Sequence, residues 1–438
     1  MTNAVNLKHL MKKMTCLKSK PAGYRNVSAV GLAALLAATT PLCAADAPAT
    51  YDPAFVEKLI HRLESAEGEI RALKAKPAAP ATAVEMPSLP QAAYPSLQFH
   101  GFGDIEYQAA NRAVNNTAQT TGVNYQQAGN SPGSYNQFYL GELDLFVSSQ
   151  LSDKFSSLIE TVIAAGTDNH WGIDVERLEL SWNPSEYFNV DIGRYHTQMG
   201  YYNTAYHHGT WFQTAVGRPS FLEFEDSGGL IPVHSVGFSI HGAVPSGNLN
   251  VNYFFEVANG RAYPTDGSGP VQNLLDGNGL KAINFALVAK PDWFSGGQFG
   301  AGIYHDTVTP PGMFNTDELI PNAHIVYHGS VWELMAEGFL IRHAPKFGSA
   351  HYTPMGYVQA ARKMGLFTPY GRFTYYNASR NDAIYSMILQ HAGAHYGPSF
   401  GLRYDISAYV ALKAQYDLMF DTGQRNASAV TLQAAFTF

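Results

Sequence analysis

The chain has 438 residues and a formal net charge of −7, with 28 Lys and Arg against 35 Asp and Glu. This acidic balance argues against a nucleic-acid partner, because phosphate backbones are bound by basic surfaces. The two cysteines, Cys16 and Cys43, both lie near the start of the chain. If that part is removed on export, a disulfide framework, thiol catalysis and cysteine-bound metal are all excluded.

Residues 1–45 predict a secretory signal peptide. Lysines recur through residues 8–20, and residues 26–45 then carry no charge. The run Cys43-Ala44-Ala45 supplies the small residues that cleavage before Asp46 requires. An uncleaved membrane anchor is the alternative, since the uncharged run is about long enough to span a bilayer. Met11 or Met14 could also be the true start.

Residues 46–76 predict a short α-helical coiled coil. After Pro53, apolar residues recur at heptad spacing, with Val56, Leu63 and Ile70 at a positions and Leu59, Ala66 and Leu73 at d positions. The alternative is a single amphipathic helix that packs against the domain that follows. Residues 77–96 are rich in Pro and Ala and predict an extended linker.

Residues 97–438 predict an all-β fold, because alternating apolar and polar side chains recur throughout this part. The last strand shows the pattern most clearly. Val430, Leu432 and Phe436 share one face with the terminal Phe438, and Thr431 lies on the other face. One apolar face and one polar face suit a closed transmembrane antiparallel β-barrel, with lipid outside and water inside.

The alternation predicts about sixteen strands, and fourteen or eighteen are the alternatives. Short turns alternate with long connections, and an even strand number places both ends of the barrel on one side of the membrane. The predicted strands are 97–108, 137–151, 155–165, 174–183, 188–199, 234–245, 248–258, 280–290, 298–307, 322–329, 331–343, 352–364, 368–377, 395–405, 408–418 and 429–438.

The longest connection, Gly200 to Val233, is rich in aromatic residues and is the third of the long connections. A barrel of this size has an aqueous lumen unless something fills it. We therefore expect this connection to pack inside, with Glu223, Glu225 and Asp226 lining a pore. The alternative is a loop folded over the barrel mouth, with those carboxylates in solvent.

Strand alternation also places charged side chains inside the barrel. They form an early, mainly acidic group and a late, basic group: Asp104, Glu106, Glu142, Asp144, Arg177 and Glu179, then Arg372, Arg403 and Lys413. Separated arcs of opposite charge would create a field across the pore and set ion preference. The alternative is mutual ion pairing that only satisfies the wall. The acidic excess mildly favours cations.

Enzymatic and metal-binding motifs are weak. Gly397-Pro398-Ser399-Phe400-Gly401 matches G-x-S-x-G, but a nucleophile elbow needs a strand-turn-helix and this run begins a predicted strand. The pair His207-His208 has no third ligand in the sequence pattern. No catalytic residue, metal site or cofactor is predicted, and we do not expect an enzyme.

The signal peptide, coiled coil, linker and barrel together resemble bacterial outer-membrane porins of the phosphate-selective and dicarboxylate-uptake group. The run from Phe400 to Asp405, followed by Val410 to Asp417, resembles their near-terminal hairpin, and Phe438 resembles their terminal assembly signal. The barrel has few lysines, so the resemblance does not extend to phosphate specificity.

The resemblance implies a homotrimeric porin in the outer membrane of a Gram-negative bacterium, in contact with lipid and lipopolysaccharide, with its N-terminal helix in the periplasm. It implies passive diffusion of small hydrophilic solutes or ions past an inward-folded third loop. The alternative is a non-channel barrel that acts as an adhesin or envelope tether. An outer-membrane hydrolase is a further alternative.

Overall fold

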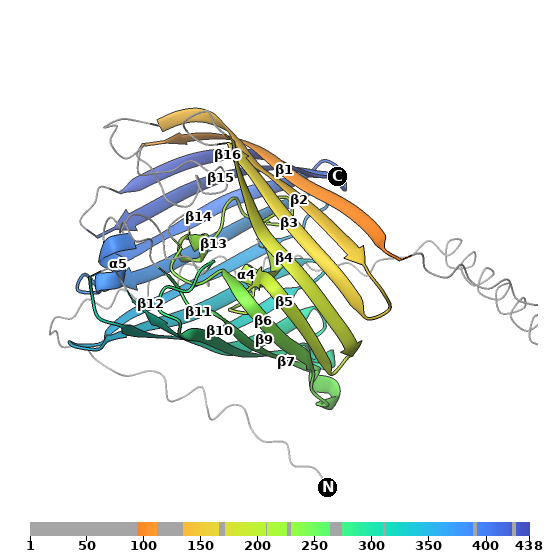
Figure 1. The fold of residues 1–438 in the computed structure, drawn as a ribbon. Coiled ribbons are helices and arrows are strands. Elements are labelled where there is room, and N and C mark those ends of the chain that lie inside the picture. The colour runs from red at the N-terminus through yellow and green to blue at the C-terminus, as the bar shows by residue number, and fades with distance from the viewer. Residues whose placement is uncertain are drawn as a thin grey trace, which may run out of the picture. The chain divides into compact units, whose positions relative to one another are not determined.

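The computed structural model describes residues 94–111, 135–165, 171–206, 208–225, 229–262, 274–309, 312–388, 392–422 and 426–438. The predicted signal peptide and coiled coil, and nearly all of the linker, lie outside these residues. Within them, sixteen strands form one closed antiparallel barrel, in which each strand pairs with its neighbours in sequence and the first pairs with the last (Figure 1). The predicted fold class and strand number are therefore confirmed.

The strands are β1 (Ser96–Ala110), β2 (Tyr135–Gln150), β3 (Phe155–Ala165), β4 (Trp171–Ser185), β5 (Phe188–His196), β6 (His234–Ala243), β7 (Val251–Asn259), β8 (Lys281–Ala289), β9 (Gly297–Val308), β10 (Thr316–His328), β11 (Trp332–Pro345), β12 (His351–Arg362), β13 (Phe367–Ala378), β14 (Gly393–Asp405), β15 (Val410–Asp421) and β16 (Ala427–Thr437). The connections carry the short helices α4 (Tyr202–Ala205), η4 (Ser220–Leu222), η6 (Gly247–Leu249), η7 (Asp292–Phe294) and α5 (Ala383–Ile388). Among the described residues, no helix combines the length and the apolar character needed to cross a membrane.

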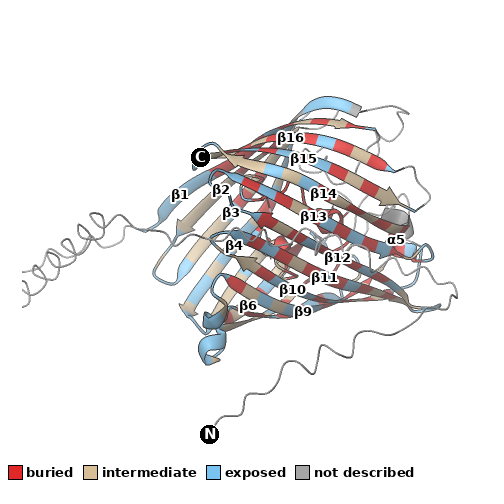
Figure 2. Cartoon of the chain, turned by 180° about the vertical axis from the view of Figure 1, so that it is seen from behind, coloured by how far each residue is buried: buried red, intermediate tan, exposed pale blue. Residues whose placement is uncertain are grey.

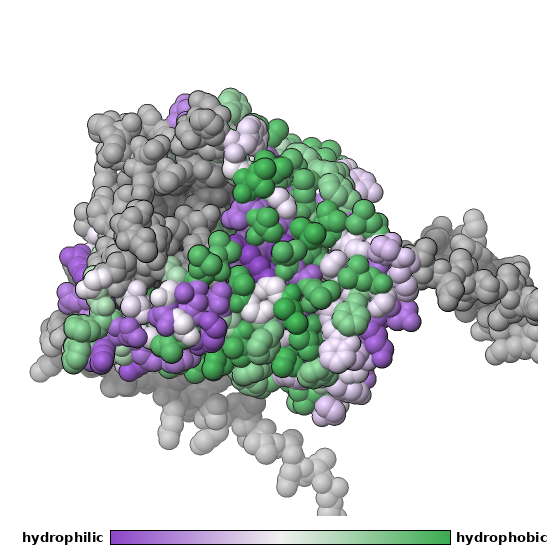
Figure 3. All heavy atoms as spheres, viewed as in Figure 1, coloured by the Kyte–Doolittle hydropathy of each residue, from purple (hydrophilic) through white to green (hydrophobic). Residues whose placement is uncertain are grey.

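Burial alternates along the strands as the sequence pattern predicts. Buried and exposed residues form regular bands along β9 to β15 (Figure 2). Apolar side chains cover much of the outer face over β2 to β5 (Figure 3). In β16, Val430 and Leu432 are exposed and Thr431 is buried, as predicted. The wall therefore has an apolar outside and a largely polar inside.

The barrel closes where β16 meets β1. The backbone N–H groups of Gly101 and Phe438 each donate to the other residue's carbonyl at 3.0 Å. The ring of Phe438 occupies the space above Gly101, where a Cβ would come within 2.2 Å of it. The absence of a side chain at Gly101 thus lets the terminal aromatic residue pack on the first strand.

Some strand boundaries differ from the prediction. The strand predicted at 322–329 begins at Thr316 as β10, and the one predicted at 188–199 ends at His196 as β5. β10 contains Pro321, although proline has no N–H for the ladder. Pro321 stays paired with Ile303 of β9, whereas the pairing with β11 passes from Leu319 directly to Asn322. The strand therefore tolerates Pro321 through its other neighbour.

Candidate lumen site

The connection between β5 and β6 folds against the inner wall of the barrel, where Figure 1 shows α4 within the ring of strands. We call the described residues between 197 and 233 the inward segment. Its two ends are fastened together, since Thr197 N–H donates to the Val233 carbonyl at 2.9 Å. The Asn203 amide donates to the same two residues' carbonyls, at 2.8 and 3.1 Å.

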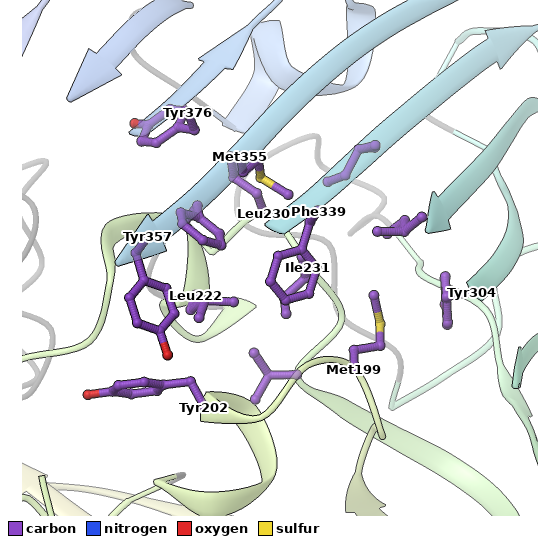
Figure 4. Packing of buried hydrophobic residues seen from close by; sticks show 14 of the residues in the cluster. Met199, Tyr202, Leu222, Leu230, Ile231, Tyr304, Phe339, Met355, Tyr357 and Tyr376 are labelled. Atoms are coloured by element: carbon purple, nitrogen blue, oxygen red, sulfur yellow. The ribbon is translucent and has the colours of Figure 1, made fainter. Parts of the chain in front are cut away.

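One side of the inward segment forms an apolar core with the wall. Met199, Tyr202, Leu222 and Ile231 from the segment are buried in one cluster, which Figure 4 shows facing Phe339 and other side chains of the wall. The wall and α5 contribute Tyr304, Val308, Ile320, Met335, Phe339, Ile341, Met355, Tyr357, Tyr376, Ile384 and Tyr385. This side of the interior, along β9 to β13, is therefore filled by packed apolar side chains.

Carboxylates of the wall hold the backbone at the start of the inward segment. Glu337 accepts hydrogen bonds from the N–H groups of Tyr201 at 2.6 Å and Tyr202 at 2.8 Å. The Tyr357 hydroxyl donates to the same carboxylate at 2.6 Å. Further along the wall, the Asn322 amide oxygen accepts from Gly200 N–H at 3.1 Å. Because these groups are buried, each bond replaces hydration that the backbone loses.

The three predicted basic residues hold the middle of the inward segment. Arg372 donates to the carbonyls of Gly217 and Val216 at 2.8 and 3.2 Å. Arg403 donates to the carbonyl of Trp211 at 2.6 Å, and Lys413 donates to that of Thr210. These side chains lie against the inward segment, and their donors bind its backbone. Arg372 and Lys413 are buried, and Arg403 is partly exposed.

The predicted acidic residues also point inward, and most are buried. Asp104 and Glu106 lie on β1, Glu142 and Asp144 on β2, and Arg177 and Glu179 on β4. Arg177 forms an ion pair with Glu160 of β3. Glu223 and Glu225 are buried within the inward segment, and Asp226 lies outside the described residues.

A chain of alternating carboxylates and imidazoles joins this acidic wall to the inward segment. His208 Nδ1 lies 2.7 Å from Glu142, and His208 Nε2 lies 3.4 Å from Glu176. His234 Nε2 lies 2.7 Å from the second oxygen of Glu176, and His234 Nδ1 lies 3.1 Å from Glu225. Each imidazole thus bridges two carboxylates, an arrangement that stabilises its charged form.

Sequence alternation misses Glu176 because β4 contains a β-bulge. In the backbone register of β3 and β4, Glu160 lies opposite Arg177, and the next residue of β3, Thr161, lies opposite Val175. Glu176 is the extra residue, and both it and Arg177 form ion pairs with inward-facing partners. Strict alternation puts these two on opposite faces, and a bulge changes that count. The bulge leaves no clear signature in the sequence.

The charge of the His208 imidazole affects the stability of the folded protein. Burial opposes its charged form, but the carboxylates of Glu142 and Glu176 raise the pKa of His208 well above its usual range. A folded-state pKa above the unfolded value gives stabilisation that is fully present below about pH 6.5 and is lost as pH rises through the raised pKa.

We therefore expect His208→Gln to lower the free energy of unfolding by about 2–3 kcal/mol at pH 6, because Glu142 loses its imidazolium partner and Glu176 loses one of its cationic partners. The difference from wild type should shrink in alkaline solution. Unfolding midpoints of both proteins in detergent at pH 6 and pH 10 measure this. His305→Gln, a half-exposed control that pairs with Asp317, should change little. A pH-independent difference would contradict a charged His208.

The weak catalytic and metal motifs have no supporting geometry in the described residues. Gly397 to Gly401 lies wholly within β14, and Ser399 donates to Asp417 of β15 at 2.5 Å. A strand-turn-helix is therefore missing at this motif. His207 lies outside the described residues. Across the described parts of the chain, no group of three or more His, Cys, Asp or Glu side chains is arranged to hold a metal ion.

The fold is that of the porins. An anion-selective porin from Comamonas acidovorans matches at a TM-score of 0.54, with 13% identity over 78% of this chain and 100% of that one. The outer-membrane channel DcaP of Acinetobacter baumannii matches at 0.56, with 11% identity over 80% and 99%. Salmonella typhi OmpF, in complex with daunomycin, matches at 0.52, with 11% identity over 78% and 97%.

At these identities the likeness concerns the fold alone. No protein-family model matches the chain, and no curated protein sequence matches it. The neighbours therefore support a porin-type barrel, while a place in the phosphate-selective or dicarboxylate-uptake group stays a prediction.

Proposed function

We propose that this protein is an outer-membrane porin that passes small hydrophilic solutes or ions by passive diffusion. The observation that carries the proposal is the closed barrel with an apolar outside and charged side chains inside, crossed by an anchored segment. A barrel with this distribution suits lipid outside and water inside. The similarity to solved porins supports the same reading at the level of the fold.

The inward segment sets the passage in this proposal. Its apolar side packs on β9 to β13. We place the solute path on its other side, next to the contact that His208 makes with the acidic wall of β1 to β4. Arg372, Arg403 and Lys413 bind backbone carbonyls of the segment. The carboxylates of the opposite wall then dominate the field along the path, and this favours cations. We also propose a homotrimer in contact with lipid and lipopolysaccharide, with residues 46–76 in the periplasm as a coiled coil.

Solute flux into vesicles tests the proposal. Full-length mature protein in proteoliposomes should give rapid swelling with small sugars and amino acids, and slower swelling as solute mass increases. Amino acids with a net positive charge should enter faster than anionic ones of equal size. Vesicles with heat-denatured protein are the control. Swelling no faster than in that control would contradict a porin.

A specific observation favours a second candidate, a non-channel barrel that serves as an adhesin or envelope tether. Many inward-facing residues of the barrel, including Glu106, Glu318 and Thr431, are buried. A lumen filled along its whole length would carry no flux. Intact folded protein that gives no swelling, yet binds cells or cell-wall material, would favour this candidate.

A further inference from the structure

One aromatic ring of the inward segment is exposed to solvent, and this is unusual for the segment. Phe212 is 47% exposed, whereas Phe221, Phe224 and Tyr202 are buried in the same segment. Phe212 lies inside the barrel, since its ring packs on the inward-facing Phe102 of β1 with centroids 4.7 Å apart. An apolar ring that is exposed inside the barrel is available to contact a solute.

The exposed ring belongs to a continuous aromatic strip. Phe146 of β2 meets Phe102 edge to face at 5.4 Å, Phe102 meets Phe212, and Phe212 meets Trp211 at 5.2 Å. The four rings, Phe146, Phe102, Phe212 and Trp211, are called the aromatic strip below. They connect the wall with the polar side of the inward segment.

The turn that carries two of these rings is held firmly. Phe212 N–H donates to the Gly209 carbonyl at 2.9 Å, and Gly209 has a φ of +72°, which favours glycine. Lys413 and Arg403 donate to the carbonyls of Thr210 and Trp211 within the turn. The predicted pore-lining cations therefore position an aromatic surface, and such preorganisation lowers the entropy lost on binding.

Cations already lie over both ends of the aromatic strip. The Arg177 guanidinium is 5.4 Å from the centroid of Phe146, and the Arg403 guanidinium is 5.8 Å from that of Trp211. Among the described residues, no cation lies over the exposed Phe212. Because an aromatic face attracts cations electrostatically, this middle ring can accept a further cation.

Carboxylates next to the strip favour a positive ligand. Asp144 of β2 stands opposite Phe102 of β1 in the antiparallel register. It is 1% exposed, and neither of its carboxyl oxygens has a hydrogen-bond partner among the described residues. Arg177 and His208 favour the charged form of Asp144, whereas burial, Glu142 and Glu160 oppose it, so a further cation nearby would favour ionisation of this carboxyl group. The two arginines at the ends offer little to an anion, since Arg177 pairs with Glu160 and Arg403 pairs with Asp405 at 2.7 Å.

We propose that the aromatic strip is a binding subsite for organic cations, namely solutes that carry an ammonium or guanidinium group with methyl or other apolar substituents. The cation stacks on Phe212, and its charge favours the ionised form of Asp144, which lies one ring away behind Phe102. This inference rests on the proposed porin function and names its solute class. An inorganic ion would gain little here, because the strip offers aromatic faces and few oxygen ligands.

Choline and its uncharged isostere 3,3-dimethylbutan-1-ol are matched probes of the subsite. Binding to the full-length mature protein in detergent is followed by broadening of the nine-proton methyl signal of each probe. This readout needs no ion flux. Choline should bind at least about fivefold more tightly than the alcohol, because a cation–π contact adds to the shared apolar contact. Equal binding of the two probes would overturn the inference and favour a neutral, carbohydrate-like ligand.

Two variants and a control localise the binding. Phe212→Leu keeps an apolar side chain without an aromatic face and should weaken choline binding about tenfold. Asp144→Asn should weaken it several-fold, and this variant decides if Phe212→Leu does not fold. Phe400→Leu removes an outward-facing exposed ring of β14 and should bind as wild type does. Unchanged choline affinity in a folded Phe212→Leu or Asp144→Asn protein would overturn the inference.

The subsite and the porin function fail separately. Choline binding without solute flux in proteoliposomes would leave the subsite standing and contradict the porin. Flux without choline binding would leave the porin standing and contradict the subsite.

Discussion

Glu337→Ala is expected to lower the free energy of unfolding by about 3–5 kcal/mol, because three hydrogen bonds to a buried carboxylate are lost at once. The N–H groups of Tyr201 and Tyr202 and the hydroxyl of Tyr357 would all lose their acceptor. Urea unfolding in detergent micelles, followed by far-ultraviolet circular dichroism, measures the change.

Two further variants sharpen this experiment. Glu337→Gln keeps one amide oxygen as an acceptor and should lose a smaller part of the stability. Glu186→Ala removes an exposed carboxylate in the turn after β4 and should stay within about 0.5 kcal/mol of wild type. If Glu337→Ala unfolded at the wild-type urea concentration, the wall carboxylate would not anchor the start of the inward segment.

The second large effect is expected for Arg218→Met, which should loosen the inward segment while the barrel stays folded. Arg218 is fully buried and donates to the carbonyls of Leu222 and Tyr206, at 2.5 and 3.1 Å. Its guanidinium also lies 4.6 Å from the ring centroid of Phe224. Methionine keeps the bulk but donates nothing, so local opening should become easier by about 2–4 kcal/mol.

Hydrogen exchange read out by mass spectrometry localises this effect. Peptides from residues 197–233 should exchange faster in Arg218→Met, while peptides from β8 to β13 keep their protection. Arg218→Lys should behave like the methionine variant in large part, since a lysine cannot donate in several directions at once as a guanidinium does. Arg380→Met alters an exposed arginine and is the control. Wild-type exchange in the segment would show that Arg218 does not organise it.

The strands could be predicted because successive side chains along each strand face lipid and the barrel interior in turn. In β16, Val430 and Leu432 are exposed and Thr431 is buried. The alternation of apolar and polar residues in the sequence predicts this pattern directly. The positions at which strands begin and end could be predicted less well. β10 begins at Thr316, before the predicted start at residue 322, and it includes Pro321, whose missing N–H affects only the pairing with β11.

Most charged residues of the candidate site could be predicted from the sequence, but the groups that they bind could not. Alternation placed Arg372, Arg403 and Lys413 inside the barrel, yet their partners are backbone carbonyls of the inward segment. Any carbonyl has the same chemistry, so no sequence pattern identifies which one an arginine binds. Glu176 was missed for a different reason, since the bulge in β4 reverses the alternation at that point.

The conductance of single molecules in a planar lipid bilayer tests the central claim most directly, with the full-length mature protein and a salt gradient across the membrane. We expect discrete steps, grouped in threes if the protein is trimeric, and a reversal potential whose sign shows cation preference. In Arg218→Met the steps should be larger or noisier, because a loosened inward segment opens the path. Folded protein that inserts into the bilayer and carries no current would contradict the account of an open, segment-lined channel.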